Sequence, residues 1–138
     1  MSALAAERAR RSIGGEKGEI MSTAISWDLM LKVNDGQLES FRSLMDEMVA
    51  STRDEPGAVI YEWFVSDDGG SVHIYERYAD SDATLAHLGG FAEKFAQRFF
   101  SMVEPTSFHA YGAPSAACRE ALEGAGAQFL SPFGGFAR

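Results

Sequence analysis

The stretch Tyr61–Phe91, YEWFVSDDGGSVHIYERYADSDATLAHLGGF, decides the fold, because it reads as a β-hairpin that runs into a helix. Two runs rich in aromatic and β-branched residues flank an Asp-Gly-Gly turn, which is a typical hairpin signal. A helix then begins in ADSDATLAHL, with Asp80 or Ser81 as its N-cap. The turn is centred on Asp68-Gly69 or on Gly69-Gly70, and both registers leave the same residues on each face.

The two faces of this hairpin differ in character. The apolar face carries Val59, Tyr61, Trp63, Val65, Val72, Ile74, Glu76 and Tyr78, and the mixed face carries Ile60, Glu62, Phe64, His73, Tyr75 and Arg77. In the Gly-Gly register Glu62 lies opposite Arg77, which predicts a cross-strand ion pair. Glu76 is the single acid on the apolar face, so it must find a partner there or line a cavity.

The segments before the hairpin predict a strand and a helix. ISWDLMLKV, residues 25–33, alternates apolar and polar residues with the period of a strand. Apolar residues then recur at spacings of three and four, which predicts an amphipathic helix from a cap at Asn34 or Asp35 to about Thr52. The residue before Pro56 is disfavoured in a helix, so the helix ends in RDEPG.

The segments after the hairpin predict two more helical stretches and a strand. We expect Gly89-Gly90 to interrupt the first helix, and a second helix to continue until Pro105. The apolar stripe of that second helix is Phe91, Phe95, Phe99 and Met102. TSFHAYG, residues 106–112, is a fourth strand, and a short helix lies between Pro114 and Gly124. The last residues, AQFLSPFGGFAR, add either an edge strand or a docked tail.

The order strand, helix, strand, strand, helix, strand predicts an α+β fold of the ferredoxin-like βαββαβ type, with an antiparallel sheet. Helices would cover the apolar face. The mixed face, to which Met30 and Asp28 of the first strand also belong, is too apolar for water and too polar for a helix-covered core. It suits a sheet that meets a second copy of itself, so we expect a homodimer that forms a dimeric α+β barrel.

The chain of 138 residues divides into a tail over residues 1–22, a ferredoxin-like domain over residues 23–113 and a C-terminal segment over residues 114–138. The tail contains Arg8, Arg10 and Arg11, and no apolar region follows them, so it does not resemble a secretory signal. Met21 opens the first periodic segment and reads like a natural start. Residues 1–20 are therefore expected to be a mobile tail or an upstream start choice.

Composition excludes several function classes. The net charge of −8 argues against nucleic acid as a partner, because phosphate binding needs clustered Lys and Arg. No run approaches the roughly 18 apolar residues that span a membrane. Cys118 is the only cysteine, so no intramolecular disulfide forms, which fits a reducing cytoplasm. We expect Cys118 to be a small core residue. No glycine-rich phosphate loop follows a strand, which gives no indication of a nucleotide cofactor.

The chain resembles the antibiotic biosynthesis monooxygenase family of dimeric α+β barrels over Ile25–Tyr111. The segments that carry the resemblance are DEPGAVIYEWF, VHIYERYADSDATLAH and the Phe-rich helix after them. The most specific pieces are Pro56-Gly57, Tyr61-Glu62, Tyr75-Glu76 and His87. The resemblance implies a homodimer. The members of this family include cofactor-independent oxygenases of quinols and polyketides, haem-degrading enzymes and an isomerase.

Two departures from the haem-degrading branch argue against haem breakdown. That branch places an iron-ligating histidine where this chain has a position near Phe95, and an asparagine where it has Trp27–Leu29. His73, His87 and His109 also lack the close spacing that places metal ligands on one helix face, so we expect no metal and no cofactor.

His87 is the strongest catalytic candidate, because imidazole transfers protons near neutral pH and His87 precedes the glycine pair. Glu76 lies on the side that His87 approaches and would fix its tautomer. We expect His87 and Glu76 to lie in a cleft between the sheet and the helices. The walls of this cleft would bind a small aromatic substrate, and the candidates for them are Tyr61, Trp63, Trp27 and Phe91. His73 and His109 are expected at the surface or at a dimer interface.

Each candidate also has a purely structural interpretation. His87 would then cap or pack against the sheet, Glu76 would bond to backbone, and the aromatic residues would be plain core. Two function classes follow. The first is a small oxygenase or isomerase that acts on an electron-rich aromatic or quinol with a base and a dry pocket. The second is a non-catalytic dimeric module that binds a small molecule or serves assembly.

Overall fold

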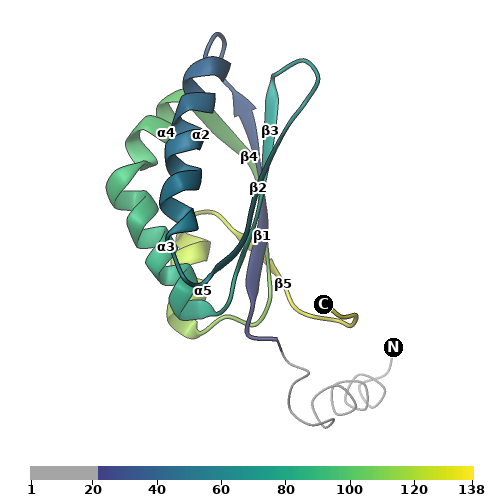
Figure 1. Ribbon diagram of the computed structural model, residues 1–138. Coiled ribbons are helices and arrows are strands. Elements are labelled where there is room, and N and C mark those ends of the chain that lie inside the picture. The colour runs from purple at the N-terminus through teal and green to yellow at the C-terminus, as the bar shows by residue number, and fades with distance from the viewer. Residues whose placement is uncertain (1–21) are drawn as a thin grey trace, which may run out of the picture.

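The computed structural model describes residues 22–138, which form a single sheet with helices packed against one side (Figure 1). The elements are β1 (Ile25–Val33), α2 (Leu38–Arg53), β2 (Ala58–Val65), β3 (Ser71–Tyr78), α3 (Ser81–Lys94), α4 (Ala96–Met102), β4 (Val103–Tyr111), α5 (Ala116–Gly124) and β5 (Gln128–Leu130). The expectation for residues 1–20, and for Met21 as a start, lies outside the described residues.

The sheet has the strand order β2-β3-β1-β4-β5. The neighbours β2, β3, β1 and β4 pair antiparallel, and β5 adds to β4 in parallel as an edge strand. This arrangement confirms the predicted α+β fold of the ferredoxin-like type. It also decides between the two expectations for the C-terminal segment, since residues 128–130 form a strand.

The hairpin takes the register centred on Asp68-Gly69, in which Val65 pairs with Val72. Gly69 supplies the left-handed backbone that the turn needs, with a φ of 73°. Glu62 therefore lies opposite Tyr75, so the Glu62–Arg77 pair of the alternative register does not form.

A β-bulge lies at the start of β2, where the register shifts between Ala58 and Ile60. Val59 is placed at this bulge and is 59% exposed, so its assignment to the apolar face is wrong. Ala58 packs there instead, against the core cluster that contains Tyr78. Further along the hairpin, the face assignment holds: Val72, Ile74, Glu76 and Tyr78 are all buried.

The start of α2 and the course of α3 differ from the predictions. α2 begins at Leu38 with Gln37 as its N-cap, so neither Asn34 nor Asp35 caps it. α3 continues through Gly89-Gly90 to Lys94, and its C-cap residue Phe95 has a φ of −127°. A glycine in a helix costs only about 1 kcal/mol relative to alanine, which the packing of the residues around it can offset.

Pro105 does not end a helix, because it lies inside β4 opposite Leu31. β5 pairs only with residues 109–111 of β4, so the outer side of β4 at Pro105 has no neighbouring strand among residues 22–138. A proline without an N–H is tolerated at such an unpaired position.

The core lies between the sheet and the helices and consists of two clusters. The first contains Leu31, Val33, Phe41, Leu44, Met48, Val72, Ile74, Phe99 and Val103. The second contains Ile25, Trp27, Tyr78, Ala110, Cys118, Leu122 and Ala127. The first joins α2 and α4 to the sheet, and the second adds α5. Among residues 22–138, no helix is both long enough and apolar enough to cross a bilayer.

Among residues 22–138, no helix lies on the other face of the sheet (Figure 1). Phe64 is 56% exposed there, while Met30, Ile60 and Tyr75 are partly buried by their neighbours on the strands. Tyr111 donates a hydrogen bond to Asp28 across this face at 3.0 Å. The face is thus the mixture of apolar and polar groups that the sequence predicted.

Candidate functional site

His87 lies on the face of α3 that packs on the sheet, and only 6% of the residue is exposed. α3 begins next to the end of β3, where Asp80 accepts a hydrogen bond from the backbone N–H of Ala83 at 2.8 Å. The imidazole ring lies among aromatic rings of three strands, with centroid distances of 4.7 Å to Tyr78, 5.6 Å to Tyr61 and 6.3 Å to Trp27.

Both nitrogens of the His87 ring meet a carboxylate. Nδ1 lies 3.1 and 3.2 Å from the two oxygens of Glu55, and Nε2 lies 3.2 Å from Oε1 of Glu76. Glu76 is itself 4% exposed and accepts a hydrogen bond from the hydroxyl of Tyr78 at 2.7 Å. These four residues, Glu55, Glu76, Tyr78 and His87, are called the His87 cluster below.

The charges of the His87 cluster favour a protonated imidazole. A neutral imidazole has one N–H and could donate to only one carboxylate, whereas an imidazolium donates to both. Burial lowers the pKa of His87, but the carboxylates of Glu76 and Glu55 more than offset this, and the pKa is raised above its usual value of about 6.5. Burial and the charge of Glu76 raise the pKa of Tyr61 and of Tyr78, which therefore remain neutral hydroxyls.

Glu55 is the member of the His87 cluster that sequence analysis missed. It belongs to the α2–β2 connection, in the segment DEPGAVIYEWF, but was not singled out as a site residue. The signal was present: this acid directly precedes the Pro-Gly pair that returns the chain to the sheet. Its distance of 32 residues from His87 hid the contact, since only the tertiary fold brings the loop to α3.

Gly57 explains how this loop reaches His87. A Cβ atom at Gly57 would overlap the Cβ of Ala83, so the loop backbone packs directly on the first turn of α3. The Gly57 carbonyl also accepts a hydrogen bond from the N–H of Ala79 at 2.8 Å. Ala83 and His87 are four residues apart and lie on the same face of the helix. The close approach at Gly57 therefore places Glu55 beside the imidazole.

The structure brings several predicted site residues together. His87, Glu76, Tyr61 and Trp27 form one group. Trp63 lies next to Tyr61, with ring centroids 5.7 Å apart, one step further along β2. Phe91 is placed elsewhere: it packs against Phe99 at 5.2 Å and Phe100 at 5.9 Å. The structure buries the side chain of His87 among rings and carboxylates, and the cleft that we expect it to face stays a prediction.

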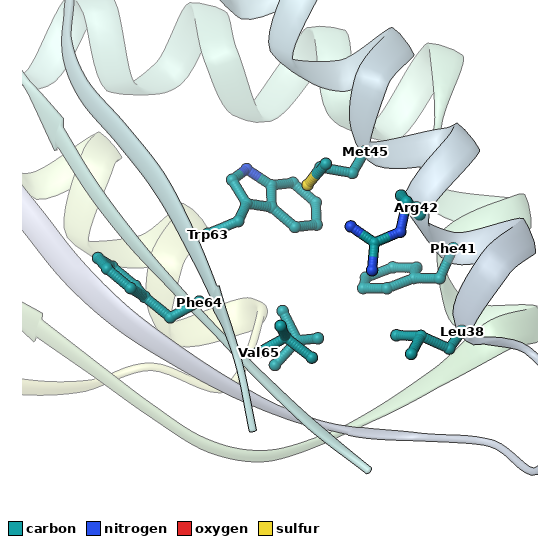
Figure 2. A pocket seen from close by; sticks show the side chains of 8 residues that line it. Leu38, Phe41, Arg42, Met45, Trp63, Phe64 and Val65 are labelled. Carbon is teal, nitrogen blue, oxygen red and sulfur yellow. The ribbon is translucent and has the colours of Figure 1, made fainter. Parts of the chain in front are cut away.

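A shallow pocket of about 160 Å³ lies between α2 and the end of the hairpin (Figure 2). Its lining is apolar except for Arg42 and consists of Leu38, Phe41, Arg42, Met45, Trp63, Phe64, Val65 and Val72. Trp63 is the one predicted wall residue in this lining, so the pocket and the His87 cluster are neighbouring regions joined through Trp63 and Tyr61.

The indole N–H of Trp63 is a buried donor without a hydrogen-bond partner among the residues that the structure describes. In Figure 2 the indole nitrogen lies on the side of the ring that faces away from Arg42 and Leu38. Buried donors in folded proteins are nearly always paired with a protein group or an ordered water, so this unpaired donor is an exception.

The remaining candidates lie apart from the His87 cluster. His73 is exposed on the face of the sheet that carries no helix, and His109 lies on the same face beside Ser107, with Nδ1 and Oγ 3.1 Å apart. Cys118 is buried in the second core cluster, as predicted, and burial raises the pKa of its thiol. Within residues 22–138, no group of three or more His, Cys, Asp and Glu side chains is arranged to hold a metal ion.

Comparison with known proteins shows a family match over part of the chain. Residues 25–90 match the model of the family described as "Antibiotic biosynthesis monooxygenase", which confirms the resemblance seen in the sequence. The curated protein "Putative monooxygenase Rv0793" of Mycobacterium tuberculosis is 38% identical over 50 residues, which are 36% of this chain and 50% of that protein. The matched segment thus spans about half the length of this relative.

Solved structures share the fold. MupZ from Pseudomonas fluorescens aligns with a TM-score of 0.73 and 22% identity, over 86% of this chain and 91% of MupZ. SnoaB from Streptomyces nogalater, described as a cofactor-independent oxygenase, aligns with a TM-score of 0.58 and 18% identity, over 68% of this chain and 96% of SnoaB. At these identities the two structures establish the fold alone.

Proposed function

We propose that this chain is a monooxygenase that acts on a quinol or polyphenolic aromatic without a bound cofactor, because residues 25–90 match the model of the antibiotic biosynthesis monooxygenase family. The observation that carries this proposal is the His87 cluster, a buried imidazole between two carboxylates and beside aromatic rings. A curated relative with the name "Putative monooxygenase Rv0793" and a structural neighbour described as a cofactor-independent oxygenase support the reaction class.

The reaction needs a base more than any other group. Removal of a hydroxyl proton gives a phenolate, which transfers one electron to dioxygen; the aryloxyl radical and superoxide then combine at a ring carbon that carries hydrogen. The peroxide anion formed takes back the proton that the base removed, and the resulting hydroperoxide loses water and leaves a carbonyl. One oxygen atom thus enters the product and the other leaves as water. The protein supplies the base, the orientation and a site that excludes water.

His87 is the proposed base, as the sequence predicted, with Glu76 as the residue that orients it. A carboxylate on Nε2 fixes the tautomer in which Nδ1 carries the lone pair, and it raises the basicity of the ring. The raised pKa of His87 brings the base closer to the pKa of a phenol, which is about 10 for tyrosine, and thus favours proton transfer.

The substrate would lie against Tyr61 and Trp63, with Trp27 behind the imidazole. Tyr61 contacts both the imidazole and the indole, at 5.6 and 5.7 Å between ring centroids, so these rings form a continuous wall along β2. Phe91 packs against Phe99 and Phe100, so we do not include it in this wall.

We also propose that the protein works as a homodimer joined through the face of the sheet that carries no helix. That face holds the exposed Phe64 and the partly buried Met30, Ile60 and Tyr75 beside polar groups. An obligate dimer of this kind buries more than roughly 2,000 Å² in total. The second subunit would close the barrel and shield the apolar residues from water.

A second candidate function is the binding of a small molecule without chemistry. The observation that favours it is that both nitrogens of His87 already have partners, as in a structural histidine. A binding module would gain thermal stability from a ligand but would not consume oxygen with it.

Oxygen uptake separates the two functions. The purified protein, without added cofactor, would be given a panel of naphthols, naphthalenediols and hydroquinones in an oxygen electrode cell, with the rate of autoxidation subtracted. A monooxygenase accelerates uptake with at least one compound, and His87→Gln lowers this rate by about 10²–10⁴. The matched control is Gln97→Ala, at an exposed position of α4. A compound that raises the melting temperature but is not oxidised supports the binding module instead.

A further inference from the structure

We propose that Glu55 carries the proton from the substrate hydroxyl to Nδ1 of His87, so that the base and the group that first meets the substrate are different residues. This inference rests on the monooxygenase function proposed above. It adds to that function a residue from the α2–β2 connection, and it follows from the exposure, the contacts and the charge of the His87 cluster.

The first argument is access. The side chain of His87 is 8% exposed and that of Glu76 is 6% exposed, whereas the side chain of Glu55 is 28% exposed. Tyr78 at the inner end of the His87 cluster is fully buried. A substrate that approaches from solvent therefore reaches Glu55 before it can reach either imidazole nitrogen.

The second argument is that no imidazole nitrogen is free. Nε2 lies against Glu76, which Tyr78 holds in place through its hydroxyl, and Nδ1 faces both oxygens of Glu55 at 3.1 and 3.2 Å. A hydroxyl can thus reach Nδ1 only by displacing Glu55 or by passing its proton through it. The second route needs no movement of the loop, which Gly57 holds tightly against Ala83.

The proton step balances as follows. In the active form His87 is neutral, with its hydrogen on Nε2 toward Glu76, and Glu55 is ionised. The O–H bond of the substrate breaks, a carboxylate oxygen of Glu55 takes the proton, and Glu55 passes it to Nδ1. The end state is a phenolate, an imidazolium and an ionised Glu55, so total charge is unchanged and the new cation lies near the new anion.

The groups that face the imidazole set the direction of the pH dependence. They are Glu55 from the loop before β2, Tyr61 from β2, Glu76 and Tyr78 from β3, and the indole of Trp27 from β1. Both acids favour the imidazolium, so turnover should rise as pH rises through the pKa of His87. Removal of the Glu55 charge should move this rise to lower pH, because one of the two groups that stabilise the imidazolium is lost.

The test compares Glu55→Gln with Asp54→Asn, the same change of charge one residue earlier at an exposed position. Oxygen uptake with the best compound of the naphthol and naphthalenediol panel gives kcat and KM. We expect Glu55→Gln to lower kcat by about 10²–10⁴ with KM changed by less than about threefold, and Asp54→Asn to leave both unchanged. Acetate added to Glu55→Ala should restore part of the rate, which would not follow if Glu55 only supported the fold.

NMR of the His87 ring supplies a readout that does not depend on turnover. Its titration midpoint should be lower in Glu55→Gln than in wild type and in Asp54→Asn. If Glu55→Gln retains a kcat within about threefold of wild type, the inference is wrong although the proposed function stands. If the wild type itself oxidises no compound, the proposed function fails and this inference fails with it. If Glu55→Gln does not fold, Glu55→Asp is tested instead, because it keeps a carboxylate. Glu55→Asp must then retain turnover, and the titration midpoint of its His87 ring must stay above the usual value for histidine.

Discussion

Replacement of His87 by alanine should destabilise the protein by about 3 kcal/mol at pH 6. Removing one partner from a buried charge pair typically costs about 3–5 kcal/mol, because the other charge is left uncompensated. The lower end applies here, since Glu55 is 28% exposed on its side chain and Glu76 keeps its hydrogen bond from Tyr78. In a chain of 138 residues, about 3 kcal/mol corresponds to a fall of roughly 12 °C in melting temperature.

The pH dependence of this loss has a definite sign. The folded pKa of His87 is raised above its unfolded value of about 6.5, so the stability that its protonation contributes is fully present below pH 6.5. That contribution is lost as pH rises through the folded pKa. The difference in melting temperature between wild type and His87→Ala should therefore be larger at pH 6 than at pH 9.

Thermal denaturation followed by circular dichroism measures both effects, with Gln97→Ala as the control for an exposed helical position. The control should melt within about 2 °C of wild type, because exposed substitutions usually change stability by less than about 0.5 kcal/mol. If His87→Ala also melts within about 2 °C of wild type at pH 6, the imidazolium does not hold the two carboxylates together, and the electrostatic reasoning is refuted.

Three further predictions concern other parts of the molecule. Gly57→Ala should lower the free energy of unfolding by about 1–3 kcal/mol and lower the His87 titration midpoint seen by NMR, because the new methyl would push the loop away from Ala83; an unchanged midpoint would show that this contact does not position Glu55. Cys118 should react with a thiol reagent only when the protein unfolds, because the side chain is fully buried and its pKa is raised; rapid labelling of the native protein would contradict this. Light scattering at micromolar concentration should give about twice the mass of one 15.0 kDa chain, and a monomer mass would rule out the proposed dimer.

The fold could be predicted from the sequence because its main signals are local. The alternation in residues 25–33, the Asp-Gly-Gly turn and the apolar stripe of α2 each specify one element, and their order specifies the topology. The errors arose where local signals compete with packing. Gly89-Gly90 was expected to break α3, but its flanking residues pack well enough to keep it helical, and Pro105 was accepted in β4 because no strand pairs with that side.

The candidate site was predicted in part for the same reason. The period of the hairpin placed Glu76 on the face that α3 covers, and this brought it to His87 as expected. The exposure of His87 and the presence of Glu55 could not be predicted, because both depend on how closely the α2–β2 loop approaches α3. That approach is determined by a contact between Gly57 and Ala83, which leaves no periodic pattern in the sequence.

The most direct test of the proposed function is an oxidation under ¹⁸O₂ with the purified protein and no added cofactor, followed by mass spectrometry of the product. A monooxygenase that uses the His87 cluster should place one labelled oxygen atom in each product molecule, and His87→Gln should form this product about 10²–10⁴ times more slowly. A product that contains no label, two labels, or the same amount of label with and without the protein would contradict the account.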